Sequence, residues 1–229
     1  MLDMMPRGGA DSALLSQLPQ DVRNCLLGRA RIRRFGRGET ICLQGEPAGA
    51  LKIITHGWIK LYRVSDTGHE ALLATLTAGQ SFDEIASLMR AECPSSAEAL
   101  CECEVMFIDL TTACGCRNAV AEITRAVMSA ASDHMQDMMD QIEALKSRSG
   151  VERLSEYLLA LSDETGGNRE LVLPFDKVVL AAKLGMKPES LSRAFARLKR
   201  FGVQSELKRV VIQDVAKLKT LARETAAYA

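Results

Sequence analysis

The sequence predicts an α+β fold in three successive parts: an N-terminal β-barrel or jelly roll, one long helix, and a C-terminal helical domain with short strands. Short β-rich runs separated by glycines occupy residues 31–110. A stretch with helical spacing and no glycine or proline follows over 118–146, and a helix-turn-helix pattern occupies 184–202. The chain has 229 residues, which is enough for two domains that each bury a core.

The N-terminal part divides into a helical segment, residues 1–30, and a β-barrel domain, residues 31–116. In the first segment, leucines and a valine recur at near-helical spacing over 12–29, and Pro19 interrupts the predicted helix. In the barrel, β-rich runs bounded by glycines predict strands at 41–43, 50–55, 58–64, 71–76 and 105–110. Many short strands at this spacing are typical of a barrel or jelly roll.

A long helix is predicted over residues 117–147. Its apolar stripe alternates in steps of three and four through Val120, Ile123, Val127, Ala130 or Ala131, His134, Met138, Gln141 or Ile142, and Leu145. At about 1.5 Å per residue this helix extends roughly 40 Å, which is more than a small barrel covers. A partner helix is the natural cover, so the stripe predicts a homodimer.

Residues 148–229 are predicted to form a winged helix-turn-helix. Gly185 suits the left-handed turn between two short helices, and Pro188 has its φ preset for the first turn of the second helix. A helix over 151–162 precedes this pair. Small flanking strands are expected at 171–173 and 210–212.

The second helix of the pair has an apolar face and a polar face. The polar face carries the residues expected to contact DNA: Lys187, Glu189, Ser190, Ser192, Arg193, Arg197 and Arg200. An arginine can donate two hydrogen bonds to guanine, a glutamate can accept one from cytosine, and the major groove admits a helix that carries them. The alternative is a small amphipathic hairpin whose charged face is only solvated.

Charge is divided unevenly along a chain whose net charge is zero. Residues 176–229 hold 12 Lys and Arg against 5 Asp and Glu, a balance of +7, which leaves −7 in residues 1–175. A basic C-terminal module favours contact with phosphates, whereas the acidic remainder would be repelled by DNA. The helix-turn-helix end is therefore the expected DNA-binding end.

Composition excludes several classes of protein. The chain has 47% hydrophobic and 25% charged residues, no apolar run of membrane-spanning length and no secretion leader. We therefore expect a cytoplasmic protein that does not bind or span a membrane. Seven cysteines, an odd number, argue against a disulfide framework. No nucleophile–base arrangement, phosphate loop or His–Glu metal motif occurs, so we expect no enzyme.

In this order of parts and in its motifs, the chain resembles the CRP/FNR family of bacterial transcription regulators along nearly its full length. The barrel motifs are Gly38-Glu39-Thr40-Ile41-Cys42-Leu43-Gln44-Gly45-Glu46-Pro47-Ala48, His56-Gly57-Trp58-Ile59-Lys60-Leu61-Tyr62-Arg63 and Gly79-Gln80-Ser81-Phe82-Asp83-Glu84. The resemblance implies a cyclic-nucleotide-binding-like sensor barrel and a dimer on palindromic double-stranded DNA, with RNA polymerase as a partner. Glu189-x-x-Ser192-Arg193 is similar to the FNR branch, which implies TTGAT-like half-sites.

By the same resemblance, Arg193 would contact guanine, Glu189 the bases of the complementary strand, and Ser192 a thymine or a phosphate. The effector pocket would include Glu84, Ser95 and Ser96. The arginine that faces the cyclic phosphate in cyclic-nucleotide members is missing beside Ser95 and Ser96, so cyclic AMP is not the expected effector. Glu84 can equally cap local backbone amides.

Two other sensor chemistries of the family lack their ligands. Only Cys25 precedes the barrel motifs, where iron–sulfur members carry three cysteines, and the ligand set of the carbon monoxide sensors is absent. What remains resembles the Dnr/NnrR branch, which implies a response to nitric oxide or nitrogen oxides and control of denitrification or nitric oxide detoxification genes. Haem is a possible cofactor, and its candidate ligands are His56, His69 and His134. The alternative is that His56 and His69 are solvated turn residues and that His134 is a packed residue of the long helix.

The cysteines offer a rival sensor. Cys101 and Cys103, followed by Cys114 and Cys116, could hold a metal or form redox-sensitive thiols if both pairs come close. The spacing differs from the common Cys-x-x-Cys ligand spacing, and cysteine is also a frequent core residue. A regulator with no small-molecule effector is the third alternative.

Overall fold

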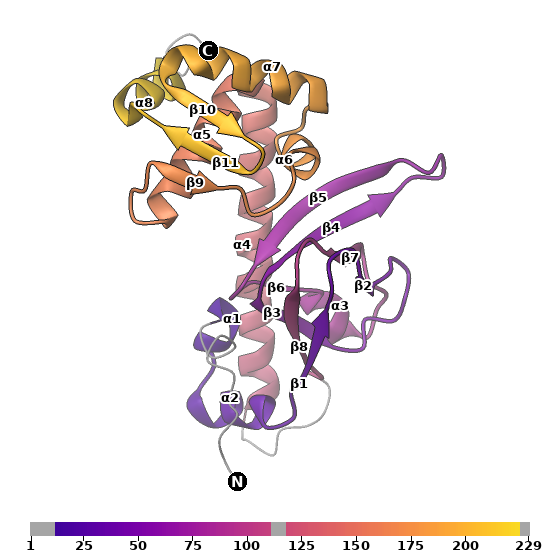
Figure 1. The fold of residues 1–229 in the computed structure, drawn as a ribbon. Coiled ribbons are helices and arrows are strands. Elements are labelled where there is room, and N and C mark those ends of the chain that lie inside the picture. The colour runs from indigo at the N-terminus through magenta and orange to yellow at the C-terminus, as the bar shows by residue number, and fades with distance from the viewer. Residues whose placement is uncertain (1–11, 111–117, 225–229) are drawn as a thin grey trace. The chain divides into compact units, whose positions relative to one another are not determined.

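The computed structural model describes residues 12–110 and 118–224, without the side chains of 222–224. Contacts divide the chain into two compact units, Met1–Gln136 and Asp137–Ala229. The boundary falls within the long helix α4 (Ala119–Ser147), which Figure 1 shows as the longest element. The predicted α+β fold is confirmed, with strands in both units. None of the helices in the described residues is both long and apolar enough to cross a membrane.

The chain enters the first unit through two short helices, α1 (Ala13–Ser16) and α2 (Gln20–Leu27). Pro19 is the N-cap of α2, so the predicted interruption of the helix is confirmed. The two helices and the turn between them bury five apolar side chains, namely Leu14, Leu15, Leu18, Val22 and Leu26. These residues share one core cluster with the barrel strands β3 and β8 and with α4.

Two four-stranded sheets form the barrel (Figure 1). The first has the order β1-β8-β3-β6 and comprises Arg31–Phe35, Cys103–Ile108, Leu51–His56 and Ser81–Phe82. The second has the order β2-β7-β4-β5 and comprises Thr40–Cys42, Ser96–Ala99, Trp58–Val64 and Glu70–Thr77. All pairings within these sheets are antiparallel. The five predicted strands are all present, and β1, β6, β7 and the helix α3 (Glu84–Met89) were not predicted.

Strand β1 was not predicted because its sequence does not alternate between apolar and polar residues. Four of its five residues are exposed, three of them arginines, and only Phe35 is buried. Arg34 Nε lies 2.7 Å from Glu104 Oε1 on the neighbouring strand β8, and the Arg33 guanidinium lies 4.9 Å from the Phe35 ring centre. The basic cluster at the start of the barrel therefore contacts the barrel itself.

Helix α4 has two apolar faces rather than one stripe. Ile123, Ala126, Val127 and Ala130 are buried against the barrel of the same chain. Val120, which the predicted stripe groups with them, is 75% exposed. A second set remains between 40% and 60% exposed: Met128, Met135, Met138, Ile142 and Leu145. The prediction of a single stripe was wrong, because the first half of that stripe serves the core of its own chain.

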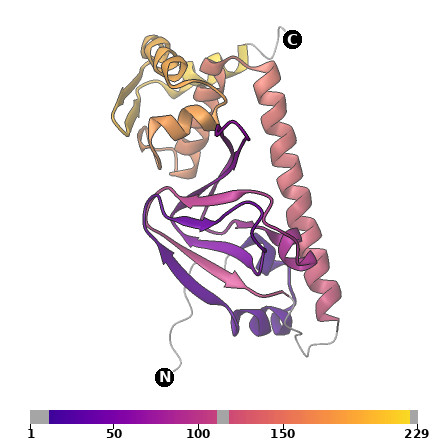
Figure 2. The same cartoon turned by 90° about the vertical axis from the view of Figure 1, so that its right-hand side faces the viewer.

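In the second unit, the end of α4 is followed by α5 (Gly150–Glu164). A capping box between Ser149 and Glu152 forms the N-terminus of α5. Then follow β9 (Glu170–Val172), α6 (Lys177–Lys183), α7 (Pro188–Leu198), the 3₁₀ turn η2 (Lys199–Phe201), β10 (Val203–Glu206), β11 (Arg209–Ile212) and α8 (Val215–Glu224). The three strands pair antiparallel in the order β10-β11-β9 (Figure 1). Figure 2 shows the same ribbon turned by 90°. The predicted winged helix-turn-helix is confirmed; β10 and α8 were not predicted.

Gly185 ends the turn between α6 and α7 with φ +61°. A Cβ at this position would collide with Cδ2 of Leu145 in α4. We therefore expect Gly185→Ala to destabilise the second unit through both the left-handed backbone, which costs an L-residue about 1–2 kcal/mol, and the collision. Urea unfolding followed by circular dichroism measures the loss.

The matched control is Gly167→Ala, since Gly167 has φ +82° and nothing within 4 Å of an added Cβ. That variant should lose only the backbone part. Equal losses in the two variants would contradict the role of Leu145, and the double variant Gly185→Ala/Leu145→Ala should recover part of the difference.

Candidate functional site

Helices α6 and α7 form the predicted helix-turn-helix. Asp176 is the N-cap of α6, and Pro188 is the first residue of α7 after the N-cap Lys187. The apolar face of α7 is buried as expected, through Leu191, Ala194, Phe195 and Leu198. Packing of this face fixes the rotation of α7, so its polar face is held outward.

The polar face of α7 carries the predicted DNA-contacting residues. Glu189, Ser192, Arg193 and Arg197 are exposed, as are the flanking Lys187 and Arg200, and Ser190 is half-buried. Arg193 Nη2 donates a hydrogen bond of 2.9 Å to Ser190 Oγ. Ser192 Oγ donates to the Pro188 carbonyl at 3.1 Å, which leaves its lone pairs to accept. The arrangement presents one oriented guanidinium, one carboxylate and one hydroxyl on a rigid helix.

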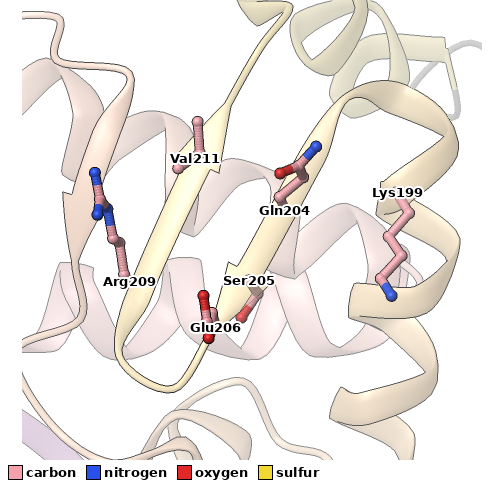
Figure 3. Close-up of a pocket in the computed structure, with 6 residues that line it drawn as sticks. All are labelled: Lys199, Gln204, Ser205, Glu206, Arg209 and Val211. Carbon is pink, nitrogen blue, oxygen red and sulfur yellow. The ribbon is translucent and has the colours of Figure 1, made fainter.

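The β10–β11 hairpin flanks α7 as a wing. Lys199, Gln204, Ser205, Glu206, Arg209 and Val211 line a hollow of about 500 Å³ beside it (Figure 3). Arg209 Nη2 is paired with Glu170 Oε2 on β9. Five of the six lining residues are polar or charged, and Lys199, Gln204, Glu206 and Arg209 are exposed.

Lys177 ties the wing to both helices. Its Nζ donates to Ser205 Oγ on β10 at 2.7 Å and lies 4.9 Å from the centre of the Phe195 ring on α7. Burial lowers the pKa of Lys177. The contact links α6, α7 and the wing, so the second unit presents them as one surface.

The predicted effector residues of the sensor barrel are all buried. Glu84 Oε1 accepts a hydrogen bond of 2.6 Å from Ser81 Oγ, and Ser96 Oγ accepts one of 3.0 Å from the Gln44 amide. Ser95 is 5% exposed. Two of the three groups are thus engaged in internal hydrogen bonds, and this bond to the Glu84 carboxylate comes from a side-chain hydroxyl rather than from a backbone amide.

The three histidines lie in different surroundings. His56, at the end of β3, is exposed and borders a hollow of about 430 Å³ whose lining includes the charged Arg34, Glu102 and Glu104. His69 is exposed in the β4–β5 turn, where its Nδ1 lies 3.1 Å from Thr67 Oγ1. Haem needs an apolar pocket, so the surroundings of His56 and His69 do not fit an axial ligand. His134 Nδ1 on α4 lies 3.8 Å from Glu84 Oε1.

The paired cysteines of the rival sensor are only partly described. Cys114 and Cys116 lie outside the described residues. Cys101 precedes β8 rather than lying in a strand, and its Sγ accepts a hydrogen bond of 3.3 Å from the Trp58 amide. Cys103 is buried in the barrel core, and burial raises its pKa to about 11. Cys101 and Cys103 therefore do not lie together within one strand, and whether the two cysteine pairs come close stays a prediction.

Sequence reasoning missed a polar cluster inside the barrel, formed by Cys42, Lys52, Asp83 and Cys93. Lys52 Nζ lies 2.6 Å from Asp83 Oδ2, and both side chains are buried. Burial alone would lower the pKa of Lys52, but Asp83 outweighs burial and holds that pKa above its ordinary value. Burial also raises the pKa of both thiols. The available signal was Lys52, which lies between the apolar residues Leu51 and Ile53 in strand β3.

Comparison with known proteins agrees with this architecture. Residues 32–113 match the cyclic nucleotide-binding domain, and residues 152–221 match the Crp-like helix-turn-helix domain. A solved regulatory protein from Silicibacter pomeroyi DSS-3, for which cAMP binding has been suggested, is 38% identical with a TM-score of 0.65, over 93% of this chain and 95% of that chain. The barrel domain and the helix-turn-helix of the present chain define a DNA-binding regulator with a sensor domain.

More distant relatives match over most of the chain. The transcriptional activator protein anr of Pseudomonas aeruginosa is 26% identical over 84% of this chain and 80% of its own length. The anaerobic regulatory protein of Pasteurella multocida is 25% identical over 85% of this chain and 73% of its own length. This chain belongs to the CRP/FNR family of DNA-binding transcription regulators. Members of this family are regulators, not enzymes.

Proposed function

We propose that this regulator acts as a homodimer in which the α7 helix of each copy reads one half-site of a palindromic DNA, with TTGAT-like half-sites. The observation that carries the proposal is the oriented polar face of α7, where Arg193 is held by Ser190 above a buried apolar face. Arg193 would donate to guanine O6 and N7, Glu189 would accept from the bases of the complementary strand, and Ser192 would contact a thymine or a neighbouring phosphate. Lys187, Arg197 and Arg200 would contact phosphates.

The dimer is proposed from the exposed face of α4. Met128, Ala131, Met135, Met138, Ile142 and Leu145 follow one another in alternating steps of three and four, as the a and d positions of a coiled coil do. We call these six residues the α4 seam. Ala131 is half-buried and the others are exposed in a single chain. A second copy of α4 is the occupant that matches this pattern, since identical seams are self-complementary about a twofold axis.

Twofold symmetry connects the two features. A parallel pair of α4 helices places two copies of α7 on one side of the dimer, where they can enter major-groove turns about 34 Å apart. RNA polymerase is the further partner that activation at a promoter requires. A change in the sensor barrel that repacks α4 would shift the balance between DNA-binding and non-binding arrangements.

Replacement of Arg193 by Ala should remove about 1–3 kcal/mol of discrimination at one base pair of the half-site, because one bidentate contact to guanine is lost. Fluorescence anisotropy with a complete set of single-base variants of the site measures it. An equal loss on every sequence would contradict base reading by Arg193.

Two variants serve as controls for Arg193. Arg200→Ala should weaken binding about equally on all sequences and reduce the salt slope by about one, as expected of a phosphate contact. Lys219→Ala removes an exposed charge on α8, outside the proposed interface, and should leave the base preference unchanged.

The double variant Met135→Glu/Ile142→Glu should dissociate the dimer, because four like charges would meet in the α4 seam. Sedimentation velocity should then show a monomer, and affinity for the full palindrome should fall to that of a single half-site. The matched control Gln136→Glu adds the same side chain at an exposed position outside the seam. A dimer that persists in the double variant would exclude the seam as its interface.

We further propose, on the resemblance to the Dnr/NnrR branch, that the signal is nitric oxide or another nitrogen oxide and that the target genes serve denitrification or nitric oxide detoxification. The relatives named as anaerobic regulatory proteins support a role in regulation under anaerobic conditions. Nitric oxide should change the DNA affinity of the anaerobic protein, and an absorption spectrum with and without added haem tests whether haem takes part. If nitric oxide leaves the DNA affinity unchanged both with and without added haem, this proposal is overturned.

A further inference from the structure

The buried polar cluster of the barrel brings together side chains from four separate segments. Cys42 lies at the end of β2, Lys52 in β3, Asp83 between β6 and α3, and Cys93 between α3 and β7. All four are between 2% and 8% exposed. Their surroundings are apolar, since Ile54, Ile59, Phe82, Ala97 and Val105 belong to the same core cluster.

The three anionic or potentially anionic groups have the geometry of metal ligands. The ligand atoms of Cys42, Asp83 and Cys93 all lie within 4.8 Å of one another. Cys42 Sγ lies 3.7 Å from Asp83 Oδ2. Around a tetrahedral zinc ion, sulfur at about 2.3 Å and oxygen at about 2.0 Å lie roughly 3.5 Å apart. The distance between these two atoms therefore matches one edge of such a site.

A cation already occupies this position. The Lys52 ammonium lies 2.6 Å from Asp83 Oδ2 and 3.9 Å from Cys93 Sγ, and it lies 5.5 Å from the centre of the Phe82 ring. The ammonium thus acts as an internal stand-in for a bound cation. Its side chain is a flexible four-carbon stem, which can turn away from Asp83 when another cation replaces it.

The charge balance of the cluster also suits a divalent ion. Without metal, neutral thiols accompany one carboxylate and one ammonium, and the cluster is neutral. A divalent ion that displaces the two thiol protons adds two positive charges and two thiolates, so the cluster stays neutral when the Lys52 ammonium turns away from Asp83 but remains beside the site as counter-charge. A buried site that stays neutral avoids the large cost of a net charge in an apolar interior.

We propose that Cys42, Cys93 and Asp83 bind a thiophilic divalent cation, zinc in type, and that Lys52 holds the site closed in its absence. Two thiolates and one carboxylate are soft and borderline ligands that select zinc over magnesium or calcium. Three protein ligands leave a fourth tetrahedral position for a water or a small signal molecule.

The site is connected to α4 through the first residues of α3. Asp83 has the left-handed φ of +61° and is the N-cap of α3, whose first residue is Glu84. Glu84 Oε1 accepts from Ser81 Oγ and lies 3.8 Å from His134 Nδ1 on α4. An exchange of Lys52 for a metal on Asp83 would therefore displace a neighbour that contacts the long helix. This regulatory consequence rests on the proposed function, whereas metal binding itself does not.

The first experiment titrates untagged, anaerobically reduced protein with Co²⁺ and then displaces it with Zn²⁺. One Co²⁺ per chain with a strong thiolate charge-transfer band is expected, together with protection of Cys42 and Cys93 from alkylation as mapped by mass spectrometry. A folded protein that takes up no Co²⁺ would overturn the proposal. Loss of the Cys42 and Cys93 thiols on exposure to hydrogen peroxide, mapped by mass spectrometry and without metal uptake, would overturn the proposal in favour of a disulfide-forming pair.

Variants separate this site from the paired cysteines. Cys42→Ala and Cys93→Ala should each abolish the charge-transfer band, and alanine suits their apolar surroundings. Cys25→Ala and Cys101→Ala are the matched controls and should retain it. Lys52→Met should bind Co²⁺ at least about tenfold more tightly, because a like charge beside the ion is removed. Retention in Cys42→Ala with loss in Cys101→Ala would overturn the proposal in favour of the other cysteines.

A separate measurement tests regulation. Zn²⁺ should change the affinity of the wild-type protein for the palindrome by at least about fivefold, and the Cys42→Ala variant should bind DNA without this response. Metal binding with unchanged DNA affinity would overturn the regulatory consequence alone. If the protein does not bind DNA either with or without metal, the proposed function is contradicted. The metal site would then still be tested by the cobalt titration, which does not depend on DNA binding.

Discussion

The apolar surface of α4 is the constraint on which the rest of the proposed mechanism depends. One side of the helix buries Ile123, Val127 and Ala130 in the core of its own barrel. The other side leaves Met135 and Ile142 about half exposed. Burial of apolar area gains about 25 cal/mol per Å², so a second copy of the helix is favoured as the cover. The same contact would then set the spacing of the two reading helices.

The second unit converts that spacing into recognition because it is rigid. Leu191, Phe195 and Leu198 hold α7 by its apolar face, and Lys177 connects α7 with the wing. A reading side chain must be held to within a fraction of an ångström to favour one base over another. The hydrogen bond from Arg193 to Ser190 contributes to this order by limiting the rotamers of the guanidinium.

The sensor barrel contains a feature that stability alone does not explain. A buried ion pair is often no more stabilising than apolar side chains of the same volume, since desolvation offsets the attraction between the charges. Lys52 and Asp83 nevertheless lie in the core beside two thiols. A cluster that exchanges its ammonium for a metal ion gives these residues a role. Its link through Glu84 to His134 ends on the same helix that carries the α4 seam.

The sequence by itself determined the order of the parts, the five strands and the reading helix, because hydrophobic period and the positions of glycine and proline are local signals. Strand β1 was missed, since its arginines hide the alternation. Only the tertiary structure decided which face of α4 serves the barrel, so Val127 was assigned to the wrong partner. Only the tertiary structure brings Cys42, Lys52, Asp83 and Cys93 together, because closure of a barrel joins segments that no local pattern relates.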